Sequence, residues 1–181
     1  MHESGPVTMR SFLALATSAA VSVVIVPGCG RFQPQRSLAA GEFATLEAIA
    51  DGIIPPDQDV GGKDAAVALF IETQLRGPYA RYAATYHTGL SRLDATAQRL
   101  EHASFVTLPA ERQTAVLAAL EKGAVPNDIW PAGEAADFFR LVCDHCMQGY
   151  YGSPRHGGNR DFASWKMLGL PYPQVVGRVV S

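Results

Sequence analysis

Apolar residues recur at intervals of three and four through most of the chain, and a proline or glycine closes each run. This spacing puts them on one face of a helix, so each run predicts an amphipathic helix. Pro55-Pro56 ends the first run and Gly77-Pro78 ends the second, because a helix seldom continues through proline. The apolar positions of these two helices are Phe43, Leu46, Ala50, Ile53, Val67, Phe70, Ile71 and Leu75.

Three further runs predict three more helices. The longest extends from Tyr79 to Leu100, the next begins at Pro109 and ends before Gly123, and the fifth spans roughly residues 133–150. One short helix is expected over residues 161–168, inside a terminal loop. The residues expected to face the core are Tyr79, Tyr82, Tyr86, Leu90, Leu93, Ala97, Leu100, Gln113, Val116, Leu117, Leu120, Phe138, Leu141, Val142 and His145.

Little of the chain alternates between apolar and polar residues, as a strand exposed on one side would. We therefore predict an all-α fold, a single compact bundle of five or six helices with a loop rich in Gly, Pro and aromatic residues at its C-terminal end. The length of 181 residues and the hydrophobic content of 48% suit one domain. A net charge of −2 with scattered Lys and Arg argues against a nucleic-acid partner.

The first 29 residues are expected to form an export signal rather than part of this domain. Residues 12–26 are an unbroken run of small and apolar residues, which as a helix would rise about 22 Å, less than a bilayer core needs. The preceding TMRSFL is similar to a twin-arginine motif in which Met9 replaces one arginine, whereas VPGC, ending at Cys29, is similar to a lipoprotein cleavage box. Cys29 is thus a candidate lipidation site, and an uncleaved anchor is the remaining possibility. Residues 30–37 would be a polar tether, and 38–181 the folded domain.

Cys143 and Cys146 form a C-x-x-C pair within the fifth predicted helix. Met147 follows the second cysteine, where a c-type haem site requires histidine, and no second pair is present to complete a zinc site. Phe139 and Tyr150 share the helical face of the two thiols, so these are expected to be structural or to pair as a disulfide. A thiol-redox or metal-binding function for the pair remains the alternative.

The terminal segment contains the most distinctive pattern of the chain, G-Y-Y-G-x-P-x-x-G-G-N-x-D-x-x-x-W-x-x-L-G-x-P over residues 149–171. Its glycines and asparagine allow left-handed backbone, its proline stiffens the turn, and its aromatic residues are of the kind enriched at interfaces. Closure of the domain's own core and docking of a partner are both open. The docking candidates are Tyr150, Tyr151, Pro154, His156, Gly157, Gly158, Asn159, Asp161 and Trp165.

This pattern resembles the small subunit of gluconate 2-dehydrogenase, the subunit 3 family. The resemblance covers roughly residues 38–171 and includes ADGIIPPD over residues 50–57 and the segment from Phe105 through Leu108-Pro109 to Gln113. The C-x-x-C pair is not part of the family pattern. The resemblance implies a non-catalytic accessory subunit, with no catalytic, cofactor-binding or metal residues of its own.

The resemblance also implies the partners of the chain. They are a large FAD-dependent subunit of the glucose-methanol-choline type, which oxidises gluconate or a related sugar or polyol, and a multihaem cytochrome c. FAD and haem c are therefore expected in partner subunits and no cofactor in this chain. The complex is expected to be periplasmic and membrane-associated, through the complex itself or a lipid anchor, and the small subunit would help to stabilise and export the flavoprotein. The alternative is a stand-alone periplasmic lipoprotein or a thiol-redox protein that uses Cys143 and Cys146.

Overall fold

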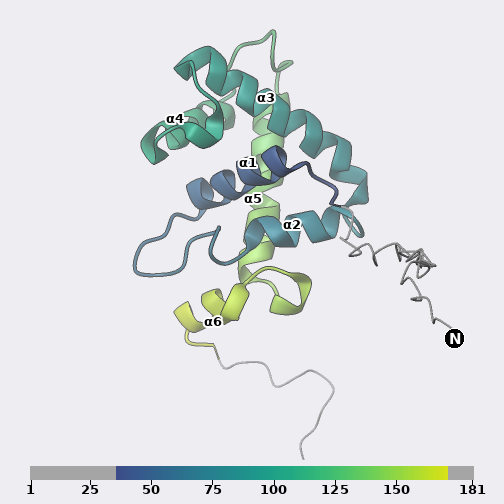
Figure 1. Cartoon of the computed structure of the whole chain (residues 1–181), viewed down its shortest axis with the longest axis vertical. Helices are drawn as coiled ribbons and strands as arrows, with labels where there is room; N and C mark the ends of the chain where they lie inside the picture. Colours follow the sequence, from purple (N-terminus) through teal and green to yellow (C-terminus); the bar gives the residue numbers. More distant parts are fainter. Residues whose placement is uncertain (1–35, 171–181) are drawn as a thin grey trace, which may run out of the picture. The chain divides into compact units, whose positions relative to one another are not determined.

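A computed structural model describes residues 36–170, which lie within the unit Gln35–Ser181. This part of the chain consists of helices and the loops that join them, without a strand, and the predicted all-α bundle is confirmed (Figure 1). Its α-helices are α1 (Ala40–Ile53), α2 (Val67–Leu75), α3 (Ala83–Glu101), α4 (Ala110–Glu121), α5 (Glu134–Tyr151) and α6 (Ala163–Met167). Its 3₁₀ turns are η1 (Ala80–Tyr82), η2 (Phe105–Thr107), η3 (Pro154–His156) and η4 (Arg160–Phe162).

Helix α5 is the centre of the fold. It contacts each of the other five α-helices and runs through the middle of the helical body (Figure 1). Its buried residues recur at intervals of three and four along its whole length, so they form an apolar stripe that reaches from one end of the helix to the other. These residues are Ala135, Phe138, Val142, His145, Cys146, Gly149 and Tyr150.

The connection between α4 and α5 contributes the largest side chain of the core. Trp130 is 2% exposed, and its indole N–H donates to Thr96 Oγ1 at 2.8 Å. Its ring lies against Phe138 of α5, with a centroid separation of 5.7 Å. Because the polar edge of the indole is satisfied, the full apolar area of Trp130 stabilises the junction of α3 and α5.

The helix ends follow the proline and glycine positions of the sequence. α1 ends at Ile53, two residues before Pro55, and α2 ends at Leu75, before Gly77-Pro78. Pro109, expected as the first residue of a helix, is instead the N-cap of α4.

The prediction of one continuous helix from Tyr79 to Leu100 was wrong at its start and right to within one residue at its end, since α3 ends at Glu101. The Tyr82 N–H donates to the Tyr79 carbonyl, three residues back, so the first turn is 3₁₀ and α3 starts at Ala83. Leu100 was expected in the core, but it is 45% exposed.

A buried carboxylate holds the start of the described chain in place. Glu72 of α2 is 2% exposed, and its two oxygens accept the backbone N–H groups of Ser37 at 2.6 Å and Leu38 at 3.0 Å. Leu38 itself is buried in the core. The first residues of the domain are therefore fixed to α2 before α1 begins.

The predicted export signal (1–29), Cys29 and most of the predicted tether (30–37) lie outside the described residues. Within residues 36–170, no helix combines the length and the apolar character that a membrane span requires.

Candidate functional site

The C-terminal segment (residues 152–170) turns back beneath α2 and α5 after α5 ends at Tyr151 (Figure 1). It consists of η3, η4 and α6 joined by tight turns. Asn159, Asp161 and Phe162 all have left-handed backbone, with φ of 45°, 55° and 59°. Such a conformation is uncommon for residues other than glycine, so the segment is tightly constrained by its surroundings.

Asn159 is the internal tie of this segment. It is fully buried, and its amide Nδ2 donates to the Gly152 carbonyl at 2.9 Å while its Oδ1 accepts the Ser164 N–H at 3.0 Å. Both ends of the side-chain amide are thus used within the chain. Asparagine meets two needs here, because it tolerates left-handed backbone and offers a donor and an acceptor together.

Gly158 and Gly149 allow the backbone of the segment to pack directly against the backbone of α5. A Cβ at Gly158 would lie 2.2 Å from the carbonyl oxygen of Gly149 in α5, so only glycine fits there. A Cβ at Gly149 would in turn lie 2.9 Å from the ring of Phe70 in α2. Gly157 adds a left-handed turn with φ of 103°. The Gly-Gly-Asn sequence therefore serves first to seat the segment on α5 and α2.

The aromatic residues of the segment divide between the interior and the surface. Tyr150 is buried, and its hydroxyl donates to the Val60 carbonyl at 2.6 Å, which ties α5 to the loop before α2. Trp165 is half-buried, and its indole N–H donates to the Tyr151 carbonyl at 3.0 Å. The Tyr151 side chain is 45% exposed. Only some of these residues are thus available to a partner.

The docking candidates therefore separate into three groups by exposure. Tyr150, Gly158 and Asn159 are buried and close the domain's own core; Pro154, Gly157 and Trp165 are half-buried; Tyr151, His156 and Asp161 are exposed.

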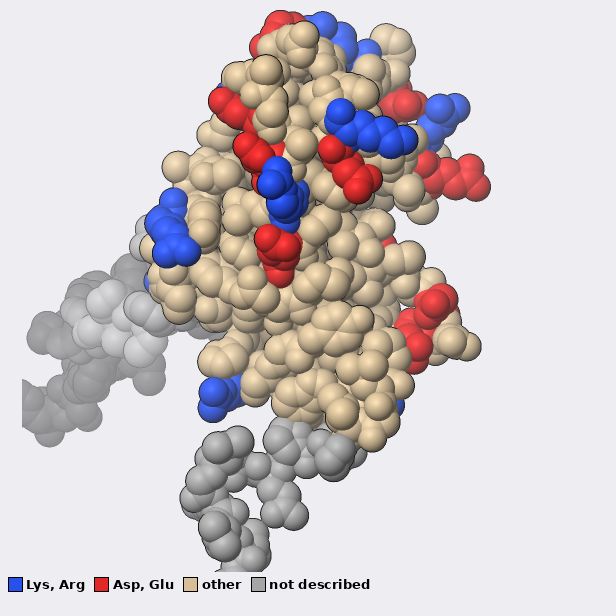
Figure 2. All heavy atoms as spheres, turned by 180° about the vertical axis from the view of Figure 1, so that it is seen from behind, with Lys and Arg blue, Asp and Glu red and all other residues tan. Residues whose placement is uncertain are grey.

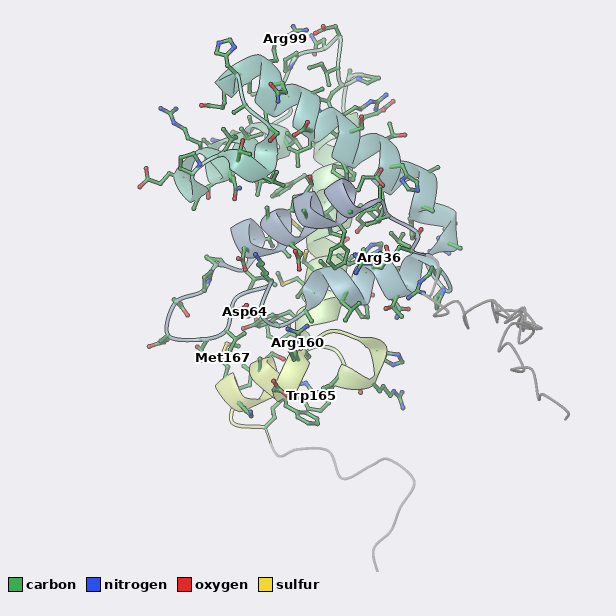
Figure 3. All side chains as sticks on the ribbon, viewed as in Figure 1. Arg36, Asp64, Arg99, Arg160, Trp165 and Met167 are labelled. Atoms are coloured by element: carbon green, nitrogen blue, oxygen red, sulfur yellow. The ribbon has the colours of Figure 1, made fainter. Side chains whose placement is uncertain are left out.

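An open cleft of about 740 Å³ separates the C-terminal segment from the loop that precedes α2. Asp64, Arg160 and Met167 line it, and Figure 3 shows them along the boundary between these two parts of the chain. Asp161, one of the docking candidates, also lines the cleft, whereas Trp165 does not. Sequence reasoning missed this cleft because its two walls lie about 100 residues apart along the chain.

His145 is the centre of an aromatic cluster that the sequence showed only as separate core positions. Its ring stacks on Tyr79 at a centroid separation of 4.2 Å and meets the edge of Tyr82 at 5.2 Å. Its Nδ1 lies 2.9 Å from the Tyr86 hydroxyl. The Tyr79 hydroxyl donates to Gln148 Oε1 on the next turn of α5. With three tyrosines around it, the imidazole is held in a fixed orientation between η1, α3 and α5.

Burial lowers the pKa of His145 from its ordinary 6.5, and Arg81 acts in the same direction, against the opposing charge of Asp144. The folded protein therefore holds the imidazole neutral at pH values where the unfolded chain already binds a proton. Burial also raises the pKa of Tyr86 well above its ordinary value. The His145 and Tyr86 side chains are therefore both neutral, and the hydrogen bond between them stabilises the fold.

We expect the free energy of unfolding to fall as the pH drops below about 6.5, because the unfolded state then binds more protons than the folded state. Urea unfolding measured at several pH values checks this. The variant His145→Gln should show a shallower decrease over the same range, whatever its stability at neutral pH. Equal slopes for the variant and the unchanged protein would contradict the assignment to His145.

The two thiols of α5 are free and lie in different environments. Cys146 is buried, whereas Cys143 is half-buried. Burial is the main cause that raises the pKa of Cys143 to about 11, and it raises the pKa of Cys146 further. Both thiols therefore stay protonated at neutral pH, and the thiolate that redox chemistry needs is disfavoured. This geometry favours the structural alternative for the pair.

Residues 36–170 place no group of three or more His, Cys, Asp or Glu side chains where they could hold a metal ion. The surface of residues 36–170 has a cleft and exposed side chains. The C-terminal segment, the most distinctive part of the sequence, mainly packs against α5 and α2.

The comparisons with known proteins identify the class. The family model for gluconate 2-dehydrogenase subunit 3 matches residues 40–171, most of the chain and the whole helical body with its C-terminal segment. The chain therefore belongs to the gluconate 2-dehydrogenase subunit 3 family, and the sequence resemblance is confirmed. Searches of the curated proteins and of the solved structures found no match.

Proposed function

We propose that this chain is the accessory small subunit of a periplasmic, membrane-associated dehydrogenase that oxidises gluconate or a related sugar or polyol. In this proposal the reaction belongs to a large FAD-dependent subunit of the glucose-methanol-choline type. A multihaem cytochrome c subunit passes the electrons on. The small subunit contributes no catalytic residue; it stabilises the flavoprotein and helps to export it.

The single observation behind the proposal is the family match over residues 40–171, since the family is that of a subunit within a larger enzyme. The geometry of the C-terminal segment agrees with a binding role. Its most distinctive residues, Gly158 and Asn159, fix the backbone of the segment through a close contact and two hydrogen bonds. A rigid surface loses little conformational entropy when a partner binds.

The export part of the proposal depends on the N-terminal residues 1–29 and on their similarity to export signals. A small subunit with such a signal could carry a flavoprotein that lacks one, provided that the two associate before export. Lipidation at Cys29 or contacts within the complex would then keep the assembly at the membrane.

The test is purification of the tagged full-length chain from its own host in mild detergent. We expect a subunit with bound FAD to co-purify and the complex to oxidise gluconate or a related polyol with an artificial electron acceptor. The same chain produced alone should show neither flavin absorbance nor oxidation. Turnover by the isolated chain would overturn the proposal, as would recovery of the chain without a flavoprotein.

A further inference from the structure

The cleft beside the C-terminal segment is bordered by backbone that hydrogen bonds attach to neighbouring parts of the fold. The Tyr150 hydroxyl holds the Val60 carbonyl at 2.6 Å, and the Arg160 N–H donates to the Ala65 carbonyl at 3.0 Å. The left-handed backbone of Asp161 further limits how its wall can move. Both walls of the cleft are therefore attached to the fold through their backbone.

The charged side chains of the cleft are of both signs and do not pair with one another. Among residues 36–170, five arginine–carboxylate ion pairs form within 4.0 Å, and they hold Arg76, Arg92, Arg99, Arg112 and Arg140 to carboxylates on the rest of the body. None involves a residue of the cleft. The unpaired charges of the cleft are Asp59, Asp64, Arg160, Asp161 and Lys166.

An apolar rim adjoins these charges. Val60 and Met167 line the cleft and are 43% and 36% exposed, and the chain continues from Met167 into Leu168 and Leu170, which are 52% and 49% exposed. Figure 2, which shows the molecule from behind, has few charged side chains over the end of the body that includes the C-terminal segment. An apolar area bordered by charges is the usual composition of a protein interface.

We propose that this cleft and its apolar rim are the surface on which the FAD-binding subunit of the dehydrogenase docks. The proposal rests on the function proposed above. The complementary segment of that subunit would present an apolar side chain toward Met167 and Val60, acidic groups toward Arg160 and Lys166, and basic groups toward the aspartates. The charges of both signs would fix its orientation, because a reversed segment would place like charges together.

A protein segment fits this surface better than a free sugar acid does. A sugar acid could meet the charges of the cleft through its carboxylate and hydroxyl groups. It would leave Met167, Leu168 and Leu170 in water, whereas a protein surface would cover them and gain from their burial.

The test compares full-length chains that carry single charge changes, each purified from the native host by the same tag. Met167→Glu places a charge on the rim, and Leu100→Glu is its matched control, since both residues lie in the last turn of a helix and are 36% and 45% exposed. Lys166→Glu reverses a cleft charge, with Lys122→Glu on the distant α4 end as the control.

We expect Met167→Glu and Lys166→Glu each to weaken association by at least about tenfold, measured as FAD recovered per tagged chain at increasing dilution. The two controls should recover as much FAD as the unchanged protein. Circular dichroism of all four isolated variants should show the same helix content and melting temperature.

Four results would overturn the inference. Unchanged FAD recovery with both cleft variants would exclude this surface while leaving the proposed function intact. Equal loss of FAD in the controls would show that the effect of the cleft variants is not specific to this surface. A dimer of the isolated chain that Met167→Glu dissociates would assign the surface to a second copy. Absence of FAD from the unchanged protein would refute the proposed function and the inference together.

Discussion

Replacement of Gly158 by alanine is expected to destabilise the domain by about 2–3 kcal/mol. The added Cβ would lie 2.2 Å from the Gly149 carbonyl oxygen and 3.0 Å from the Cβ of Phe70. The first of these atoms belongs to the backbone of α5, the central helix, and cannot rotate away as a side chain would. The strain must therefore be relieved by displacement of the C-terminal segment. Urea unfolding monitored by circular dichroism measures the loss.

The matched control is Gly41→Ala in the first turn of α1, where a Cβ would meet no atom within 4 Å. Alanine should leave stability unchanged or raise it slightly there, since it has the higher helix propensity. Displacement of the segment has its own readout, because Arg155 and Arg160 are exposed. Trypsin should cut at these sites faster in Gly158→Ala. Equal stability of the two variants would show that the close contact at Gly149 is not rigid.

The helices were predictable from the sequence because their signals are local. The apolar spacing of α1 and α2, and the prolines and glycines after them, determine where these helices form and end within a few residues. The break at Tyr82 was not predictable in this way. The same apolar spacing is compatible with an α-helical or a 3₁₀ first turn, and the packing of Tyr79 on His145, 66 residues away, accompanies the 3₁₀ turn.

The candidate site was less predictable, because it depends on contacts between distant residues. The pattern around Gly158 and Asn159 indicated a constrained turn, and the structure has one. What the turn contacts could not be read from the pattern, since the Arg160 N–H that follows it donates to the carbonyl of Ala65, a residue far away in the sequence. The cleft exists only after those contacts form.

The two halves of the C-terminal segment therefore have different roles. Gly158 and Asn159 attach the segment to α5. Both residues are buried, so they offer a partner little to recognise. Asp161, Lys166 and Met167 follow directly and face the cleft. A rigid base with exposed charged and apolar groups beyond it is the arrangement that gives specific binding at small entropic expense.

Replacement of Glu72 by glutamine is the other change for which we expect a large effect, a destabilisation of about 2–3 kcal/mol. The two carboxylate oxygens accept the Ser37 and Leu38 N–H groups in a site that is 2% exposed. Glutamine keeps the shape but turns one acceptor into an N–H donor, which would face a backbone donor without water to separate them. It also removes the charge that strengthens the remaining bond.

The consequence should be local as well as global, because Glu72 is what fixes the first residues of the domain to α2. Arg36 is exposed and directly precedes Ser37, so tryptic cleavage after Arg36 should become faster in Glu72→Gln under conditions where the domain remains folded. Glu47→Gln on α1 is the control, since Glu47 forms no hydrogen bond or ion pair within residues 36–170. It should unfold at the same urea concentration as the unchanged protein and show the same cleavage rate. If Glu72→Gln also matched the unchanged protein in both measurements, the start of the domain would be held by the burial of Leu38 alone.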